Sequence, residues 1–304
     1  MDSILSFLNA CPGAVSQGII WGIMGVGVFI TFKVLDYADL TVDSSLCTGG
    51  AVSAMLIGLG MHPVLTLLFA MIAGMLAGAV TGLLHTKLEI PAILSGILTQ
   101  LALYSVNLRI MGRANVSLLG QPTMITLLDI PHAILIGALV AVVMIGVLYW
   151  FFGTEIGCAV RATGDNENMA RAMGVNTDTM KVLGLTISNG MVGLAGALLA
   201  QYQGYSDVQS GRGAIVIGLA SVIIGEVRIG KRANFAVRMA SIIVGSIVYY
   251  VIISFVLQLG LSTTDLKLFS ALVVAIALAI PSLRQKLALR RKLGLRGGAA
   301  GKGR

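Results

Sequence analysis

Residues 132–152 read HAILIGALVAVVMIGVLYWFF and contain no Lys, Arg, Asp or Glu. About 20 mostly apolar residues are enough for one helix to cross the hydrocarbon core of a bilayer. This run is therefore long enough to span a membrane. Similar apolar runs recur along the chain and make nine candidate segments: 14–32, 40–60, 64–84, 91–111, 132–152, 181–201, 213–228, 239–259 and 266–283. The run at 213–228 is short, which indicates a re-entrant or tilted segment.

The composition excludes a soluble protein. Of the 304 residues, 57% are apolar and 11% are charged, whereas soluble domains carry about 25% charged residues. The net charge of +8 arises mostly from the last 21 positions, which offer few aromatic side chains for base stacking, so no nucleic-acid partner is expected. We predict an all-α, polytopic membrane helix bundle of about nine segments (eight to ten), with at least one broken helix.

The distribution of Lys and Arg predicts the orientation. If the basic tail, residues 284–304, is cytoplasmic, 17 of the 21 Lys and Arg residues fall on the cytoplasmic side, as the positive-inside rule expects. An odd number of spans then places the N-terminus outside, although residues 1–10 could instead lie flat in the membrane interface. We expect residues 1–283 to form the membrane domain and the tail to lie against anionic lipid.

The second segment has a polar first half that begins with Asp39, Thr41 and Asp43. An aspartate within a membrane costs about 2.5–3.5 kcal/mol on insertion scales. Two of them indicate a wet or protein-lined environment, a later start of the span, or a helix broken near Thr48–Gly50. Asp39 and Asp43 are four residues apart, which predicts that they share one helical face. They could relay protons, or they could cap the start of a span and bind a neighbouring helix.

Other segments carry small and polar residues that indicate close helix contacts. Gly74, Gly78 and Gly82 recur at four-residue spacing in the third segment, which permits close approach of another helix. The fourth segment carries Gln100 and Asn107 at membrane depth.

The longest predicted cytoplasmic loop, residues 154–181, is the most polar region outside the tail. We predict a short helix in it, from about Asn166 to Met173. The candidate capping residues are Asp165 or Asn166 at its start, Gly174 after its end, and Asn176 or Thr177 at the start of the next helix. Met169 and Met173 would form one apolar face. The helix could be a docking element on the cytoplasmic surface, or the whole region could be an ordinary solvated loop.

The sequence contains no convincing catalytic, nucleotide or metal site. Residues 225–232, GEVRIGKR, nearly match a phosphate-binding loop, but Arg232 stands where the Mg²⁺-binding hydroxyl is needed. His62, His85 and His132 each stand alone near a predicted membrane boundary, without a second histidine at ligand spacing. We therefore expect no cofactor, no metal and no covalent chemistry.

Several stretches together resemble the permease subunits of branched-chain amino acid and ribose-type ABC importers. These stretches are ADLTVDS at 38–44, KLEIPA at 87–92, GDNENMARAMGVN at 164–176, SNGMVGLAG at 188–196 and VIIG at 222–225. The resemblance covers about residues 15–283 and is closest to the branch thought to import tryptophan or tyrosine. The chain departs from the family pattern at Asp43, where relatives have Gly, and in the basic turn at 225–232.

The resemblance implies a bacterial plasma-membrane protein that does no covalent chemistry itself. Its implied partners are a second permease subunit, most simply an identical chain, two ATPase subunits beneath, and an extracellular solute-binding protein or lipoprotein above. ATP would act through the cytoplasmic loop helix to alternate access to a small solute, most simply an amino acid, with an aromatic one as the finer implication of the resemblance. The implied coupling residues are Asp165, Asn166, Glu167, Asn168, Ala170, Arg171, Met173 and Gly174. The polar residues placed near the translocation path are Asp39, Thr41, Asp43, Gln100, Asn107, Ser188 and Asn189.

Two alternatives remain open at this point. An ion-coupled secondary transporter would use Asp39 and Asp43 as its coupling site and would not need a cytoplasmic docking helix. An ABC permease for a sugar or a nucleoside would keep the mechanism and change the solute. A membrane enzyme or a purely structural scaffold fits less well, because the first needs a catalytic constellation and the second leaves the buried polar groups without a purpose.

Overall fold

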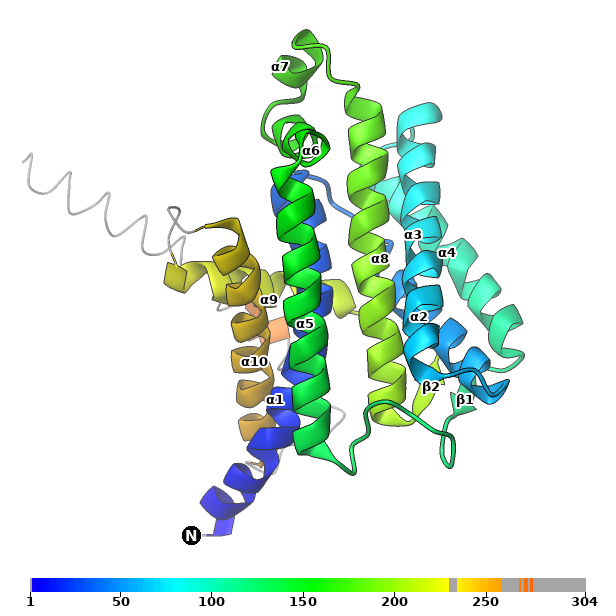
Figure 1. Ribbon diagram of the computed structural model, residues 1–304, viewed down its shortest axis with the longest axis vertical. Helices are drawn as coiled ribbons and strands as arrows, with labels where there is room; N and C mark the ends of the chain where they lie inside the picture. The colour runs from blue at the N-terminus through cyan, green and yellow to red at the C-terminus, as the bar shows by residue number, and fades with distance from the viewer. Residues whose placement is uncertain (1, 230–233, 259–267, 269–270, 273, 276–304) are drawn as a thin grey trace, which may run out of the picture.

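The computed structural model describes residues 2–229, 234–258, 268, 271–272 and 274–275. The chain forms a helical bundle with one small β-ribbon (Figure 1). The helices are α1 (Asp2–Phe29), continued by the π-helix η1 (Ile30–Val34), α2 (Val42–Gly58), α3 (Pro63–Lys87), α4 (Ala92–Met111), α5 (Ile130–Gly153), α6 (Glu155–Asp165), α7 (Glu167–Ala172), α8 (Thr177–Gln203), α9 (Ala214–Ile229) and α10 (Phe235–Gln258). The strands are β1 (Asn115–Ser117) and β2 (Tyr205–Asp207).

Helices match eight of the nine predicted segments. Six of these helices are long and apolar enough to cross a membrane, and two shorter apolar ones lie at 42–58 and 214–226. The ninth segment, 266–283, lies mostly outside the described residues. The short seventh segment is α9, which lies across the bundle while α5 and α8 run along it (Figure 1). Helix α9 is thus inclined to both of these helices, and whether it is re-entrant or tilted in the membrane stays a prediction.

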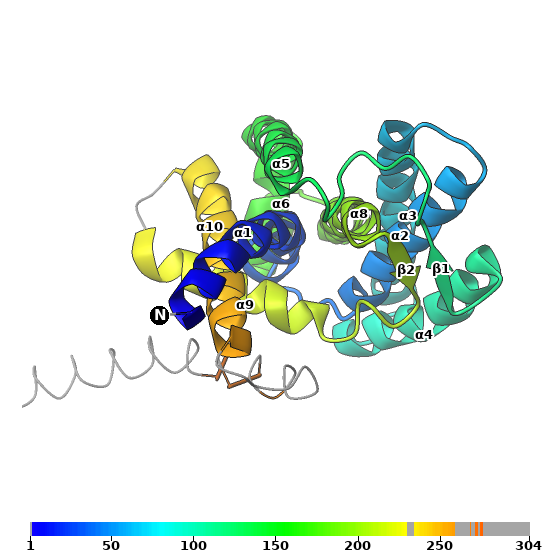
Figure 2. The ribbon, with the colours of Figure 1, turned by 90° about the horizontal axis from the view of Figure 1, so that it is seen from below.

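Helix α8 stands at the centre of the bundle, with α1, α9 and α10 on one side and α2, α3 and α4 on the other (Figure 2). Glycines on α3 permit its close contact with α8. A Cβ atom at Gly74 would overlap the carbonyl oxygen of Asn189, and one at Gly78 would overlap that of Leu185. The predicted role of the glycine spacing in helix approach is confirmed.

Helix α2 runs unbroken through Thr48–Gly50, so the predicted possibility of a helix break at these residues is wrong. The glycines serve packing instead, because a Cβ atom at Gly49 would overlap the carbonyl oxygen of Gly193 on α8. The chain leaves helical structure elsewhere. Residues 35–41 before α2 and 208–213 before α9 are irregular, and both short helices begin inside the bundle rather than at its ends (Figure 1).

We expect Gly49→Ala to lower the melting temperature of the detergent-solubilised protein by several degrees. The added methyl group forces α2 away from α8, and overpacking of this kind costs about 1–3 kcal/mol. Gly58→Ala is the matched control on the same helix, because nothing lies within 4 Å of a Cβ atom there. Equal melting temperatures for the two variants would contradict the packing account.

Sequence reasoning did not reveal the β-ribbon at the end of the bundle opposite α7 (Figure 1). Strands β1 and β2 pair antiparallel, with Val116 opposite Ser206. The strands follow α4 and α8, and Gly204 ends α8 in a left-handed conformation with φ of 75°. The ribbon therefore joins the C-terminal ends of α4 and α8.

Candidate functional site

The loop at 154–181 contains the predicted short helix, α7. The side-chain oxygen of Asn166 accepts a hydrogen bond from the N–H of Met169 at 3.0 Å, which makes Asn166 the N-cap, while Asp165 ends α6. Asn176 caps α8 in the same way, through the N–H of Thr179 at 3.2 Å. Gly174 between the two helices has φ of 86°, a conformation that other residues rarely adopt. Local signals thus define both helix starts.

A network of charges fixes α7 to the start of α8. Both carboxylate oxygens of Glu167 accept hydrogen bonds from Nζ of Lys181 at 2.8 Å, and Arg171 donates to Glu167 at 3.1 Å. Arg171 also donates to the hydroxyl of Thr177 at 2.9 Å and pairs with Asp178 at 3.7 Å. The hydrogen bond from Lys181, with the charges of Lys181 and Arg171, lowers the pKa of Glu167 below its ordinary value.

The opposite face of α7 is exposed and apolar. Met169 is 64% exposed and Met173 is 77% exposed, whereas Ala170 is buried toward α8. Large apolar side chains exposed beside a polar rim are typical of an interaction site. Of the other predicted coupling residues, Asp165, Asn166, Asn168, Arg171 and Gly174 are exposed and Glu167 is half-buried.

Helix α6 connects α7 to the membrane core. A Cβ atom at Gly164 would overlap the carbonyl oxygen of Val34 at the end of η1. Val160, on the same helix, is fully buried and contacts the position of Gly184 on α8. Helix α6 therefore packs closely against both the end of η1 and α8.

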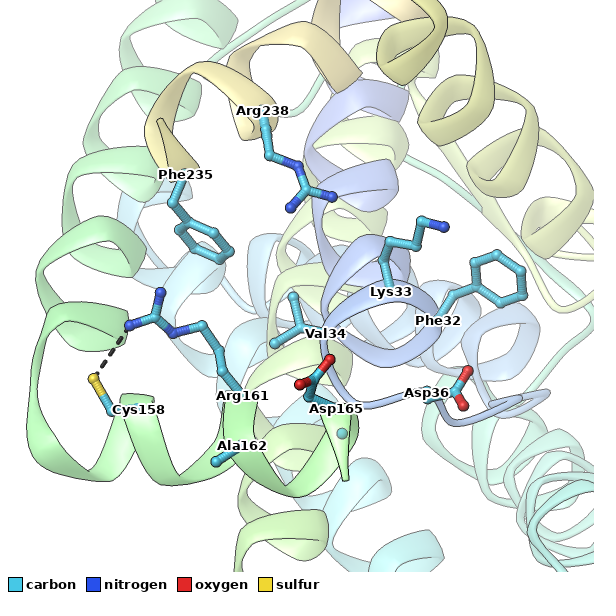
Figure 3. Close-up of a pocket in the computed structure, with 11 residues that line it drawn as sticks. Phe32, Lys33, Val34, Asp36, Cys158, Arg161, Ala162, Asp165, Phe235 and Arg238 are labelled. Atoms are coloured by element: carbon cyan, nitrogen blue, oxygen red, sulfur yellow. Dashed lines mark hydrogen bonds between the residues drawn. The ribbon is translucent and has the colours of Figure 1, made fainter. Parts of the chain in front are cut away.

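A polar cavity of about 700 Å³ opens beside α6, between the end of η1 and the start of α10. Figure 3 shows Lys33, Arg161 and Arg238 around it, with Asp36 and Asp165. Arg161 donates to the carbonyl of Phe152 at 2.8 Å and to Sγ of Cys158 at 3.2 Å. Sequence reasoning missed this cavity, because its residues come from three separate parts of the chain, 32–36, 158–165 and 235–238.

The first candidate path residues form a buried cluster near the middle of α8. One oxygen of Asp39 accepts from the N–H of Thr41 at 2.9 Å, and the other accepts from the side-chain amide of Asn189 at 2.7 Å. Ser45 donates to Asn189 at 2.7 Å, and the hydroxyls of Thr41 and Thr81 are 2.7 Å apart. Asp39, Thr41 and Asn189 are each at most 2% exposed. The cluster holds the irregular segment 35–41 against α8.

Asp39 and Asp43 do not share a helical face, and that prediction is wrong. Asp39 precedes α2, which begins at Val42. Asp43 lies in the first turn of α2, and its oxygens accept from the N–H groups of Gly213 at 3.0 Å and Ile215 at 2.9 Å. Asp43 therefore caps α9, a helix 170 residues further along the chain.

The other candidate path residues lie apart from this cluster. Ser188 donates to the carbonyl of Gly27 at 2.7 Å and joins α8 to α1. Gln100 is half-buried, and its backbone carbonyl accepts from Ser44. Asn107 is fully buried, and its amide has no hydrogen-bond partner among the described residues. The structure thus joins Asp39, Thr41 and Asn189 and leaves the rest on separate contacts.

The chain matches the family model described as branched-chain amino acid transport system / permease component over residues 13–280. The chain belongs to this permease family. It is a permease subunit of an ABC-type transport system, non-catalytic and multi-pass in the inner membrane. The family resemblance predicted from the sequence is therefore confirmed, and the family implies ATPase and binding-protein partners.

Two curated relatives are similar to this permease over nearly its whole length, and a third over part of it. The tyrosine transport system permease protein of Clostridioides difficile (strain R20291) is 41% identical over 280 residues, which are 92% of this chain and 94% of the relative. An uncharacterized protein of Rickettsia prowazekii (strain Madrid E) is 32% identical over 90% of this chain and 98% of its own length. The autoinducer 2 import system permease protein of Yersinia pseudotuberculosis serotype O:1b (strain IP 31758) is 32% identical over 62% of this chain and 54% of its own length. No solved structure matches.

We expect Glu167→Gln to speed hydrogen exchange of the α7 amides at neutral pH, because it weakens the contact with Lys181. Since the pKa of folded Glu167 lies below the ordinary value of 4.5, its contribution is present above about pH 4.5 and is lost as the pH falls through the folded pKa. The wild-type permease should therefore lose protection of α7 only at acidic pH. Exchange rates, corrected for intrinsic pH dependence, provide the measurement, and exposed Glu155→Gln on α6 is the control.

Proposed function

We propose that this permease subunit imports an amino acid, most specifically an aromatic one, and that a separate ATPase drives it through α7. Two copies of the chain would surround the path. An extracellular binding protein would deliver the solute, and two ATPase subunits would bind the two α7 helices. The observation that carries this proposal is the exposed Met169–Met173 face on a helix that is fixed at its other face.

Three observations support α7 as the coupling element. A helix of six residues is not stable alone in water, yet this one is capped at its start and bound to α8 by Glu167. Its apolar face is left for a partner. Its connection to α1 and α8 through α6 is close-packed, so a push on α7 is transmitted rather than absorbed.

The proposed movement has two distinct components. When ATP closes the ATPase pair, α7 and α6 would move as one body against the cytoplasmic ends of α1 and α8. The irregular segments 35–41 and 208–213 would absorb the change, because loop residues accommodate backbone rotation more readily than helices do. Access to the solute would then alternate between the two sides of the membrane.

The solute is proposed from the 41% identical relative, whose name states tyrosine transport. That relative is matched over nearly its full length, whereas the autoinducer 2 permease is matched over 54% of its length. The first relative is therefore the better guide to the solute. We also propose that the basic tail binds anionic lipid and that the two permease subunits are identical chains.

The test is uptake by the complex that co-purifies with the tagged permease from its native membrane. The complex is reconstituted into vesicles with its binding protein and given labelled L-tyrosine, L-leucine or D-ribose. We expect ATP-dependent uptake of tyrosine that a protonophore does not reduce. Uptake that needs a proton gradient and not ATP would support the ion-coupled alternative, and ATP-dependent uptake of ribose alone would contradict the proposed solute.

A further inference from the structure

A second cavity lies between α1, α9 and α10, with a volume of about 580 Å³. This is within the range of about 300–1,000 Å³ that is usual for small-molecule sites. Its wall contains three aromatic residues. The ring centroids of Trp21 and Tyr250 are 5.9 Å apart, and those of Tyr249 and Tyr250 are 5.4 Å apart with the rings nearly perpendicular. Such a wall is suited to an aromatic ring.

The same cavity contains a cationic group. Arg212 lines it together with Gly213, and both residues are exposed. Arg212 makes no ion pair within the part of the chain that the structure describes. The cavity thus combines an apolar aromatic wall with an unpaired guanidinium group.

The backbone at Arg212 lies near the mid-depth of the bundle, although its place in the sequence is a loop on the predicted outer side, and its exposed side chain lines the cavity. The N–H of Gly211 donates to Sγ of Cys47 on α2 at 3.1 Å, and the N–H of Gly213 donates to Asp43. The start of α2 is in turn bound to the middle of α8, through Ser45 and Asn189. The segment 208–213 therefore returns from the outer ribbon to about the mid-depth of α8. An arginine at that depth indicates a solute path.

The geometry points to this cavity as a binding site for the aromatic amino acid, with the ring against Trp21 and Tyr250 and the carboxylate on Arg212. This inference rests on the proposed function and adds the site that performs it. A guanidinium group binds a carboxylate through two parallel hydrogen bonds, which fixes the orientation of the ligand as well as its charge.

Other features of the cavity agree with this ligand. Asp43 already accepts from the N–H groups of Gly213 and Ile215, so the start of α9 is neutralised and Arg212 is the group left for an anion. The indole N–H of Trp21 has no partner among the described residues, although a buried indole usually has one. A lipid chain would fill the apolar part of the cavity and leave Arg212 unused.

The first test is direct binding to the full chain in nanodiscs. The chain has two tryptophans, Trp21 and Trp150, and Trp150 is 72% exposed on α5. The variant Trp150→Phe therefore leaves Trp21 as the reporter of the cavity. We expect L-tyrosine to change the fluorescence of Trp21 in a saturable way, and tyramine, which lacks the carboxylate, to bind about tenfold or more weakly. No change with tyrosine, or equal binding of tyramine, would overturn the inference.

The second test compares uptake by variants of the reconstituted complex. Arg212→Gln should raise the half-saturating tyrosine concentration by about tenfold or more and remove the preference for tyrosine over tyramine. Ser254→Phe, which fills the cavity, should also reduce tyrosine uptake. Arg113→Gln, at an exposed position outside this cavity, is the control for charge.

The outcomes separate the two levels of the proposal. If the wild-type complex imports no aromatic amino acid, the proposed function fails. If the wild type imports tyrosine and Arg212→Gln behaves like Arg113→Gln in affinity and in tyramine discrimination, the proposed function stands and the cavity is not its site.

Discussion

Replacing Met173 with Asp is expected to abolish ATP-driven uptake while the permease still folds and inserts. Met173 is 77% exposed and makes the outermost part of the α7 face, so its own subunit loses little when it changes. In the proposed complex this side chain enters a groove of the ATPase, where a carboxylate would be buried without a partner. Losing a central apolar contact costs about 2 kcal/mol or more, which is roughly 30-fold in affinity.

The measurement is co-purification of the ATPase with each tagged variant, together with ATP hydrolysis and uptake. Arg171→Glu is the companion variant, because it puts a third carboxylate beside Glu167 and Asp178 and loosens α7 from within. Leu128→Asp is the matched control, since it makes the same change at a residue that is 96% exposed outside α7. An ATPase that still co-elutes with Met173→Asp and still drives uptake would exclude α7 as the coupling element.

The α7 region was predictable from sequence because its signals are local. Asn166, Gly174 and Asn176 act on backbone groups within three or four residues, so their order along the chain defines two helix starts and a turn. The apolar runs were predictable for the same reason, since a spanning helix satisfies its own backbone. The glycines of α3 were informative because their spacing alone places them on one face.

The interior polar contacts were not predictable, because their partners are far apart in sequence. Asp43 meets Gly213 across 170 residues, and Asp39 meets Asn189 across 150. Spacing suggested one helical face for the two carboxylates, but α2 starts between them. The depth of Arg212 was hidden for a similar reason, because a loop that re-enters the bundle has the same local sequence as one that stays outside.

Exchanging the carboxylate of Asp39 with the amide of Asn189 is expected to show that their hydrogen bond stabilises the fold. Asp39→Asn leaves two amide groups facing each other or turns one toward the N–H of Thr41, so a donor meets a donor in either rotamer. Asn189→Asp places two carboxyl groups face to face. Each unsatisfied buried group costs about 1–3 kcal/mol, so both single variants should melt well below the wild type.

The double variant Asp39→Asn with Asn189→Asp restores a donor opposite an acceptor. It keeps an acceptor for the hydroxyl of Ser45, and its one unfavourable contact is a carboxylate oxygen facing the carbonyl of Leu185, where the amide of Asn189 donates in the wild type. We therefore expect most of the lost melting temperature to return, as a positive coupling energy in the double-mutant cycle. ATP-driven uptake should return with it if the contact acts by holding residues 35–41 against α8.

The ion-coupled alternative predicts the reverse pattern, and this makes the exchange decisive between the two mechanisms. If Asp39 carried protons, its carboxylate would be needed at that place in the chain, and moving it to residue 189 would not restore uptake. The Asp39→Asn variant would then fold normally, and the one property it would lose is uptake driven by the proton gradient. The fully bonded carboxylate, 2% exposed and held by Thr41 and Asn189, argues for the structural role, because a relay group must exchange partners during transport. A double variant with restored stability and no uptake would overturn that conclusion.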